Sequence, residues 1–65
     1  MIAKLVIHRI DFTKGKEETT DTVKVSADKP YLISTIANGI LLESRSVTKV
    51  EIYNDIDCLI ATRTR

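Results

Sequence analysis

The chain has 65 residues, with ten basic and nine acidic side chains and a net charge of +1. This length allows one domain, residues 1–65, and such a small domain buries only about 60% of the surface that its unfolded chain exposes. Disulfides are excluded because there is a single cysteine, and one Cys with one His cannot supply the four ligands of a structural zinc site. We therefore expect self-association, or unusually good packing, to supplement the core.

Charges of both signs are interspersed along the chain, so electrostatics gives no strong indication of a nucleic-acid binder. The apolar N-terminal stretch is interrupted by Lys4, His8 and Arg9, and it lacks the uninterrupted apolar region of a signal peptide. No apolar run reaches the roughly 18 residues that span a bilayer. With one thiol and no export signal, a cytoplasmic protein that does not enter membranes is expected.

The first expected element is a long strand over residues 2–13, which is rich in Val, Ile and Phe. Both of its faces carry apolar side chains, a pattern typical of a strand that is covered on two sides. Gly15 predicts a turn. Val23 and Val25 alternate with polar residues, which predicts a second, antiparallel strand over residues 20–26. The sequence leaves open whether the hairpin over residues 14–22 is ordered.

A helix is predicted over residues 29–43, with Asp28 as its N-cap and Pro30 in its first turn. The β-branched residues and Gly39 weigh against a helix, but the helical spacing of the apolar side chains outweighs this propensity. At 100° per residue these side chains fill one broad arc. The arc consists of Leu32, Ile33, Ile36, Ala37, Ile40 and Leu41.

Two more strands are predicted over residues 47–54 and 56–64, joined by a tight turn at Asn54-Asp55. In the last strand, Ile56, Cys58 and Ile60 are expected to face the core. The resulting fold class is α+β, with a ββαββ order, a four-stranded mostly antiparallel sheet and one helix packed on one face. The first strand is best placed in the centre of the sheet.

Two expected surfaces look incomplete without a partner. The helix has no charged residue between residues 30 and 42, although solvated helix faces usually carry Lys and Glu. The sheet face opposite the helix carries apolar side chains, which usually mark an interaction surface. The alternative is an ordinary solvated face whose apolar residues are covered by lysine stems. The residues predicted for self-association or partner binding are Val6, Ile10, Phe12, Tyr31, Ser34, Asn38, Leu42, Tyr53 and Leu59.

No set of residues predicts an active site, so we expect neither an enzyme nor a cofactor or metal site. His8 has no nucleophile or carboxylate within a motif. Cys58 is expected to be a buried, inert thiol, and Asp57 beside it has the wrong charge to activate it. Asp55 and Asp57 offer too few oxygens for a hard cation. Neither glycine has the spacing of a phosphate-binding loop.

The sequence therefore predicts a small non-enzymatic protein-interaction module of the inhibitor or adaptor type, which forms a homodimer or a higher oligomer. Proteins of this size without motifs are often encoded by phages or mobile elements. The alternative is a small nucleic-acid-binding regulator that uses the open sheet face. The residues predicted for that alternative are Lys4, Lys24, Lys49 and Arg63.

Overall fold

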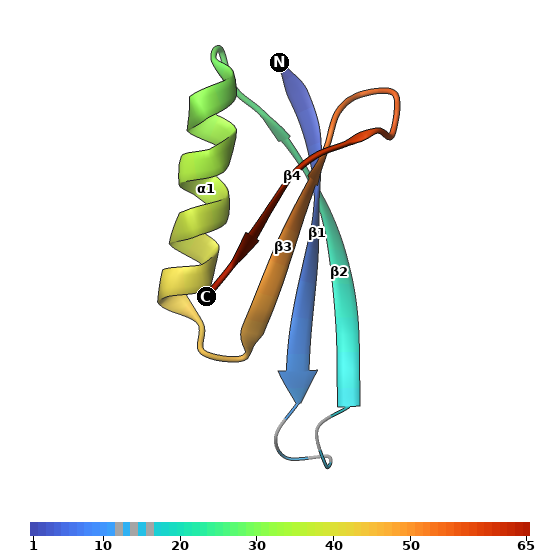
Figure 1. The fold of residues 1–65 in the computed structure, drawn as a ribbon, viewed down its shortest axis with the longest axis vertical. Coiled ribbons are helices and arrows are strands. Elements are labelled where there is room, and N and C mark those ends of the chain that lie inside the picture. The colour runs from blue at the N-terminus through green and yellow to red at the C-terminus, as the bar shows by residue number, and fades with distance from the viewer. Residues whose placement is uncertain (12, 14, 16) are drawn as a thin grey trace.

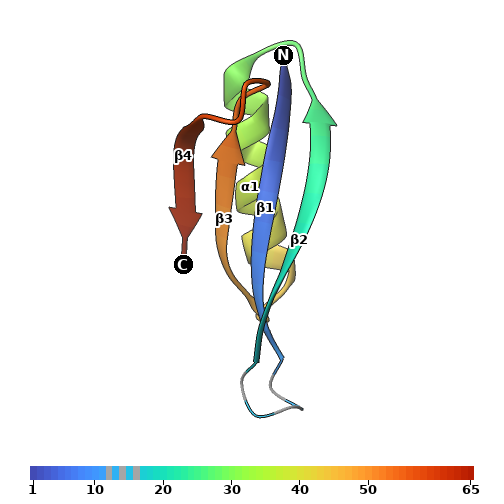
Figure 2. The ribbon, with the colours of Figure 1, turned by 90° about the vertical axis from the view of Figure 1, so that its right-hand side faces the viewer.

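One helix packs on one face of a four-stranded antiparallel sheet in the computed structural model, which describes residues 1–11, 13, 15 and 17–65 (Figure 1). The strand order is β2-β1-β3-β4, so the first strand is internal (Figure 2). This arrangement confirms the predicted α+β class and ββαββ order. The described elements are β1 (Ile2–Asp11), β2 (Glu17–Ser26), α1 (Pro30–Glu43), β3 (Val47–Tyr53) and β4 (Leu59–Thr64).

The core lies between α1 and the two inner strands. The register pairs Leu5 of β1 with Ile52 of β3, and Ile7 with Val50, so these four side chains share the face that meets the helix. Burial on this face is the main favourable contribution to folding, at about 25 cal/mol per Å² of apolar surface. The buried apolar residues are Ala3, Leu5, Ile7, Ile33, Ala37, Leu41, Val47, Val50 and Ile52.

The buried stripe of α1 is narrower than the predicted arc. Leu32 and Ile36 remain 37% and 38% exposed. On the opposite flank of the helix, Ser34 Oγ accepts a hydrogen bond of 3.3 Å from Arg63 Nη2 of β4. Leu32 and Ile36 therefore lie on the flank that faces β2. That strand is exposed at every residue except Val25, because the helix contacts β3 and β4 instead.

The predicted N-cap is wrong. Lys29 occupies the N-cap position of α1, in an extended conformation, and its side chain makes no capping hydrogen bond. Pro30 follows at the first helical position, as expected, because its missing N–H costs nothing there. The helix is held by its packing on the sheet rather than by its cap.

The predicted turn between the last two strands is present, closed by a hydrogen bond of 3.1 Å from the Asp57 N–H to the Asn54 carbonyl oxygen, but it is longer than predicted. Residues 54–58 form a longer connection, in which Asn54 Oδ1 accepts hydrogen bonds from the backbone N–H groups of Ile56 (3.1 Å) and Cys58 (2.9 Å). Asp57 adopts a positive φ of 62° in this connection. Strand β4 consequently begins at Leu59 rather than at residue 56, and Cys58 is exposed rather than buried.

The other boundaries differ by a few residues. β1 ends at Asp11 instead of residue 13, β2 begins at Glu17 instead of residue 20, and β3 ends at Tyr53. The paired part of the β1–β2 hairpin is therefore longer than predicted, and it extends beyond the end of α1 (Figures 1 and 2). No helix in the described part of the chain is long and apolar enough to cross a membrane.

The molecule is extended for its size. Its radius of gyration is 12.0 Å, whereas about 11 Å is typical of 65 residues. Its accessible surface is 4538 Å², whereas about 4,200 Å² is typical of a 7.3 kDa monomer. The projecting hairpin and the thin two-layer body both contribute to this excess of surface.

Candidate functional site

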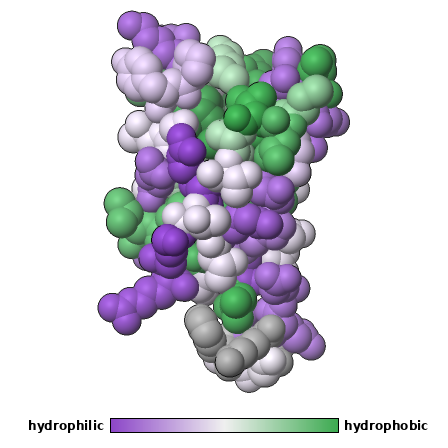
Figure 3. All heavy atoms as spheres, in the orientation of Figure 1, coloured by the Kyte–Doolittle hydropathy of each residue, from purple (hydrophilic) through white to green (hydrophobic). Residues whose placement is uncertain are grey.

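An exposed apolar cluster lies at the start of β4 and in the connection before it. Ile56 is 73% exposed, Leu59 52% and Ile60 49%. Figure 3 shows hydrophobic side chains gathered in the upper right of that view, over the β3–β4 connection and the first residues of β4. We call these three residues the β4 edge patch, since β4 is the outermost strand on this side of the sheet.

A register irregularity explains why the patch is exposed. Ile52 pairs with Ala61 while Tyr53 pairs with Leu59, so Ile60 is an extra residue on β4. Such a bulge leaves one residue out of the pairing and changes the direction of the side chains that precede it. Ala61, not Ile60, then turns toward the core, where it packs against the buried residues. The predicted core position of Ile60 is wrong for this reason.

The two edges of the sheet differ in chemistry. β2 carries charged residues along its length, including Glu18, Asp21 and Lys24, and such charges discourage pairing with another strand. β4 has no charged residue from Leu59 to Thr62. An edge strand with exposed apolar side chains and no charge is a ready template for strand addition. The sheet is therefore protected at one edge and open at the other.

The helix adds to this surface on the same side of the molecule. Tyr31 is 62% exposed and Leu42 82% exposed on the outer face of α1. A hollow of about 340 Å³ lies between this helix and the end of β4. It is lined by Asn38, Leu41, Leu42, Thr64 and Arg65. The hollow connects the uncharged helix face with the open edge of the sheet.

The sheet face opposite the helix carries a chain of polar contacts. His8 Nε2 lies 2.5 Å from Glu51 Oε1, and the Tyr53 hydroxyl donates a hydrogen bond of 3.3 Å to Glu51 Oε2. Lys4 Nζ stands 5.0 Å from the centre of the Tyr53 ring and 2.8 Å from Asp57 Oδ1. The cation over the aromatic face holds the end of β3 against β1, and the ion pair holds the β3–β4 connection against β1.

These contacts shift the acidity of three groups. The hydrogen bond from His8 lowers the pKa of Glu51, against a smaller opposing effect of burial. Burial and the neighbouring Glu51 carboxylate raise the pKa of Tyr53. The hydrogen bond and charge of Lys4 lower the pKa of Asp57. The ionised carboxylates and the neutral phenol are therefore favoured. The polar groups of this face are thus paired with one another.

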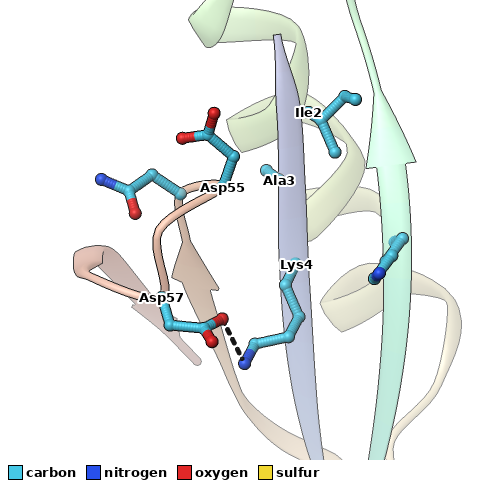
Figure 4. A pocket seen from close by; sticks show the side chains of 7 residues that line it. Ile2, Ala3, Lys4, Asp55 and Asp57 are labelled. Carbon is cyan, nitrogen blue, oxygen red and sulfur yellow. Dashed lines mark ion pairs between the residues drawn. The ribbon is translucent and has the colours of Figure 1, made fainter.

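A second hollow, of about 320 Å³, lies on this face between the β3–β4 connection and β2 (Figure 4). Figure 4 shows Asp57 reaching down to Lys4 at the edge of the hollow. Both hollows are at the lower limit of the 300–1,000 Å³ typical of ligand pockets. The lining of this one is Ile2, Ala3, Lys4, Lys24, Asn54, Asp55 and Asp57.

The structure separates the residues predicted for self-association. Val6, Ile10 and Tyr53 lie on the open sheet face, where Val6 is half-buried and pairs with Thr22 and Glu51 on either side. Polar neighbours and internal pairs thus surround the apolar residues there. Phe12 lies outside the described residues. Tyr31, Ser34, Asn38 and Leu42 lie on α1, and Leu59 lies at the start of β4, opposite Tyr53.

Only some of the four basic residues predicted to bind nucleic acid lie on the same face of the sheet. Lys4, Lys24 and Lys49 lie on the open sheet face, since Lys4 pairs with Lys24 and Lys49 pairs with His8 in the strand register. Arg63 lies on the other face, where it reaches Ser34 of the helix.

Sequence reasoning missed Ile56, Ile60 and Glu51. Strict alternation places the first two in the core, but Ile56 lies in the β3–β4 connection and Ile60 is the extra residue of the bulge on β4. Glu51 pairs with His8 across two strands, and only the register between β1 and β3 reveals that contact. Within residues 1–11, 13, 15 and 17–65, no three His, Cys, Asp or Glu side chains are grouped so as to hold a metal ion.

Comparisons with models of protein families, with curated proteins and with solved structures found no match to this chain.

Proposed function

We propose that the chain is a small non-enzymatic protein-interaction module, of the inhibitor or adaptor type, that acts as a homo-oligomer. The observation that carries this proposal is the β4 edge patch, in which Ile56, Leu59 and Ile60 are each about half exposed or more. Contiguous apolar surface at an uncharged sheet edge is typical of a contact site for another chain. The uncharged outer face of α1 supports the same reading.

The same proposal includes the statement that the chain does not catalyse a reaction. His8 and Glu51 form a pair, but Tyr53, the group that completes it, has a raised pKa and serves as a hydrogen-bond donor. The two open hollows offer little enclosure for excluding water from a reaction.

Multi-angle light scattering at micromolar concentration tests the proposal. We expect a mass that is a multiple of 7.3 kDa and that persists in high salt, since apolar association is not screened by ions. Ammonium sulfate should strengthen the association. A clean monomer mass across the whole concentration range would contradict the proposal.

A nucleic-acid-binding regulator is the second candidate, because three lysines and Tyr53 share the open sheet face. Two features weigh against it: Asp57 neutralises Lys4, and Glu51 places a negative charge in the middle of that face. Fluorescence polarisation with single- and double-stranded oligonucleotides at low salt decides between the two. Salt-sensitive binding would favour the regulator, and no binding would exclude it.

A further inference from the structure

We propose that the occupant of the β4 edge patch is a second copy of this chain, whose β4 pairs antiparallel with the first. The two four-stranded sheets then form one continuous eight-stranded sheet. This inference rests on the proposed function, because it names the partner and the geometry of the same surface. It is carried by the uncharged first part of β4, from Leu59 to Thr62, by the exposed Leu59 and Ile60 within it, and by the helix surface next to it.

Symmetry makes a β4–β4 contact self-limiting. Antiparallel pairing of two identical edges has a two-fold axis perpendicular to the sheet, so it closes as a dimer. Pairing of β4 with the β2 of another copy would instead repeat without closing and would build a filament. The charged residues along β2, such as Glu18 and Lys24, disfavour that second arrangement.

The same axis brings the two helices together. Because the axis is perpendicular to the sheet, both copies of α1 lie on the same face of the continuous sheet. Neighbouring strands are about 4.8 Å apart, so the two β3 strands, which lie under the helices, are about 14 Å apart. A helix with its side chains is about 10–12 Å across. The side-chain surfaces of the facing flanks are then separated by only about 2–4 Å, which brings the two surfaces that carry Asn38 and Leu42 close to each other.

This geometry accounts for the missing charge on the helix. The flank toward the axis includes the hollow of about 340 Å³ lined by Leu41 and Leu42, which opens beside β4. A partner strand at β4 would cover this hollow together with the β4 edge patch. Lysines or glutamates on that flank would be buried without partners, at a large cost in free energy. One two-fold contact therefore accounts for both the uncharged flank of α1 and the uncharged stretch of β4 from Leu59 to Thr62.

The cations at the end of β4 do not oppose the contact. Arg63 Nη2 donates to Ser34 Oγ, and Arg65 Nε donates to the backbone oxygen of Val47 over 3.0 Å. Arg65 Nη2 also donates to the backbone oxygen of Ser44. Both guanidinium groups thus bind acceptors of their own chain, which holds them away from the partner's equivalents.

A stable dimer would need only a modest part of the exposed surface. A standard interface removes about 800 Å² from each partner, which is about 18% of the 4538 Å² that this chain exposes. The excess of surface over a typical monomer of this mass is consistent with a contact of that kind. The contact would be formed by β4, by the connection before it and by the flank of α1 that borders the hollow at the end of β4.

A cysteine scan along β4 tests the pairing directly. Facing residues of an antiparallel pair share a face, so the two-fold axis must pass through one residue that lies opposite its own copy. The Cα atoms of such a pair are about 4.5–5.5 Å apart, which suits a disulfide. In a Cys58→Ser background, single cysteines are introduced in turn at positions 60 to 63, and each variant is mildly oxidised. We expect one of them to form a covalent dimer rapidly and in high yield.

Matched positions on the other edge provide the control. Thr20→Cys and Thr22→Cys in the same background place exposed thiols on β2. They should cross-link no faster than unfolded chains at the same concentration. Cross-linking at the β2 positions, or at none of the positions, would overturn the β4 pairing.

A charge substitution separates this inference from the proposed function. Ile60→Lys places a charge in the β4 edge patch of each copy, where the contact would bury it, and should convert the dimer to a monomer in light scattering, with unchanged helical circular dichroism. Thr20→Lys, on β2, should remain a dimer. If the wild type is an oligomer and Ile60→Lys leaves it intact, the β4 pairing is wrong while the homo-oligomer stands. If the wild type is a monomer, both are wrong.

Discussion

At the scale of residues, the open sheet face shows how cross-strand register turns ordinary surface side chains into a connected set. Val6 lies opposite Glu51, and the residues on either side of it on the same face, Lys4 and His8, bind groups from β3 and the connection after it. Each contact is modest by itself because all of these groups retain access to solvent. Together they fix the β3–β4 connection over β1, which positions the patch at the start of β4.

Glu51→Gln tests the electrostatic part of this set. The pKa of Glu51 is lowered from its ordinary 4.5, mainly by His8, so at acid pH the unfolded chain binds more protons than the folded one. The contribution of Glu51 to stability is therefore present above about pH 4.5 and is lost as the pH falls through the lowered pKa. The melting temperature of the wild type should fall more steeply than that of Glu51→Gln between about pH 5 and pH 3.

Glu43→Gln is the control for this measurement, since Glu43 is an exposed carboxylate at the end of α1. It should follow the wild type when melting is monitored by circular dichroism at fixed protein concentration. If Glu51→Gln and the wild type lose stability in parallel over this range, the pair with His8 contributes nothing to folding.

At the scale of elements, α1 is stabilised by its buried face rather than by its ends. Its N-cap lacks a side-chain hydrogen bond, it has no acidic residue in the first turn and no basic residue in the last, and Gly39 lies in its third turn. Isolated helices of this length are marginal in water, so the contacts of Ile33, Ala37 and Leu41 must supply most of the stability. The N-cap and Gly39 can each be replaced by a residue that favours the helix without a change in the core.

Lys29→Ser should stabilise the protein by about 1 kcal/mol, because a serine at the N-cap can accept a hydrogen bond from the backbone N–H of the first turn. For a domain of this size the gain corresponds to about 4–8 °C in melting temperature. Lys29→Ala is the matched control, since it removes the same lysine without adding an acceptor. Equal melting temperatures for the two variants would show that Lys29 is not at the N-cap.

Gly39→Ala should stabilise the helix by about 0.5–1 kcal/mol. An added Cβ at Gly39 meets nothing within 4 Å, and its φ is not positive. Gly15→Ala is the opposite case, because Gly15 has a φ of 77° and an alanine there is strained by about 1–2 kcal/mol. Urea unfolding of both variants should give changes of opposite sign, and the same sign for both would contradict the assignment.

Patterns that repeat along the chain predicted these elements well. The spacing of Ile33, Ala37 and Leu41 indicated the helix, and the two apolar faces of β1 indicated its central position. The connection at residues 54–58 was not predictable, because its length depends on the Asn54 side chain and on the positive φ of Asp57 rather than on periodicity. That one local feature decides where β4 starts.

The candidate site could be predicted from the sequence only in outline. The uncharged helix face and Leu59 were visible as apolar residues without charged neighbours. Ile56 and Ile60 were not, because alternation placed them in the core, and the bulge at Ile60 depends on the register with β3. The apolar residues of the open face, Val6 and Ile10, are half-buried among polar neighbours instead of forming a bare patch.

At the scale of the whole molecule, the sheet is asymmetric. One edge, β2, is long, charged and exposed, while the other, β4, is short, begins with the apolar residues Leu59 and Ile60 and lies beside an uncharged helix flank. A two-layer body with a radius of gyration of 12.0 Å and a core of few side chains gains most from a partner that extends its sheet and covers its helix. At the β4 edge, a single contact with a partner would both extend the sheet and cover the helix.

Amide hydrogen exchange at two protein concentrations tests the β4 contact most directly. In the dimer, the outward-facing N–H groups of β4 donate to the partner strand, so their exchange should be slow at high concentration and should accelerate on dilution below the dissociation constant. The outward-facing N–H groups of β2 should exchange rapidly at both concentrations. If the β4 amides exchange as rapidly as those of β2 at high concentration, no second copy covers that edge.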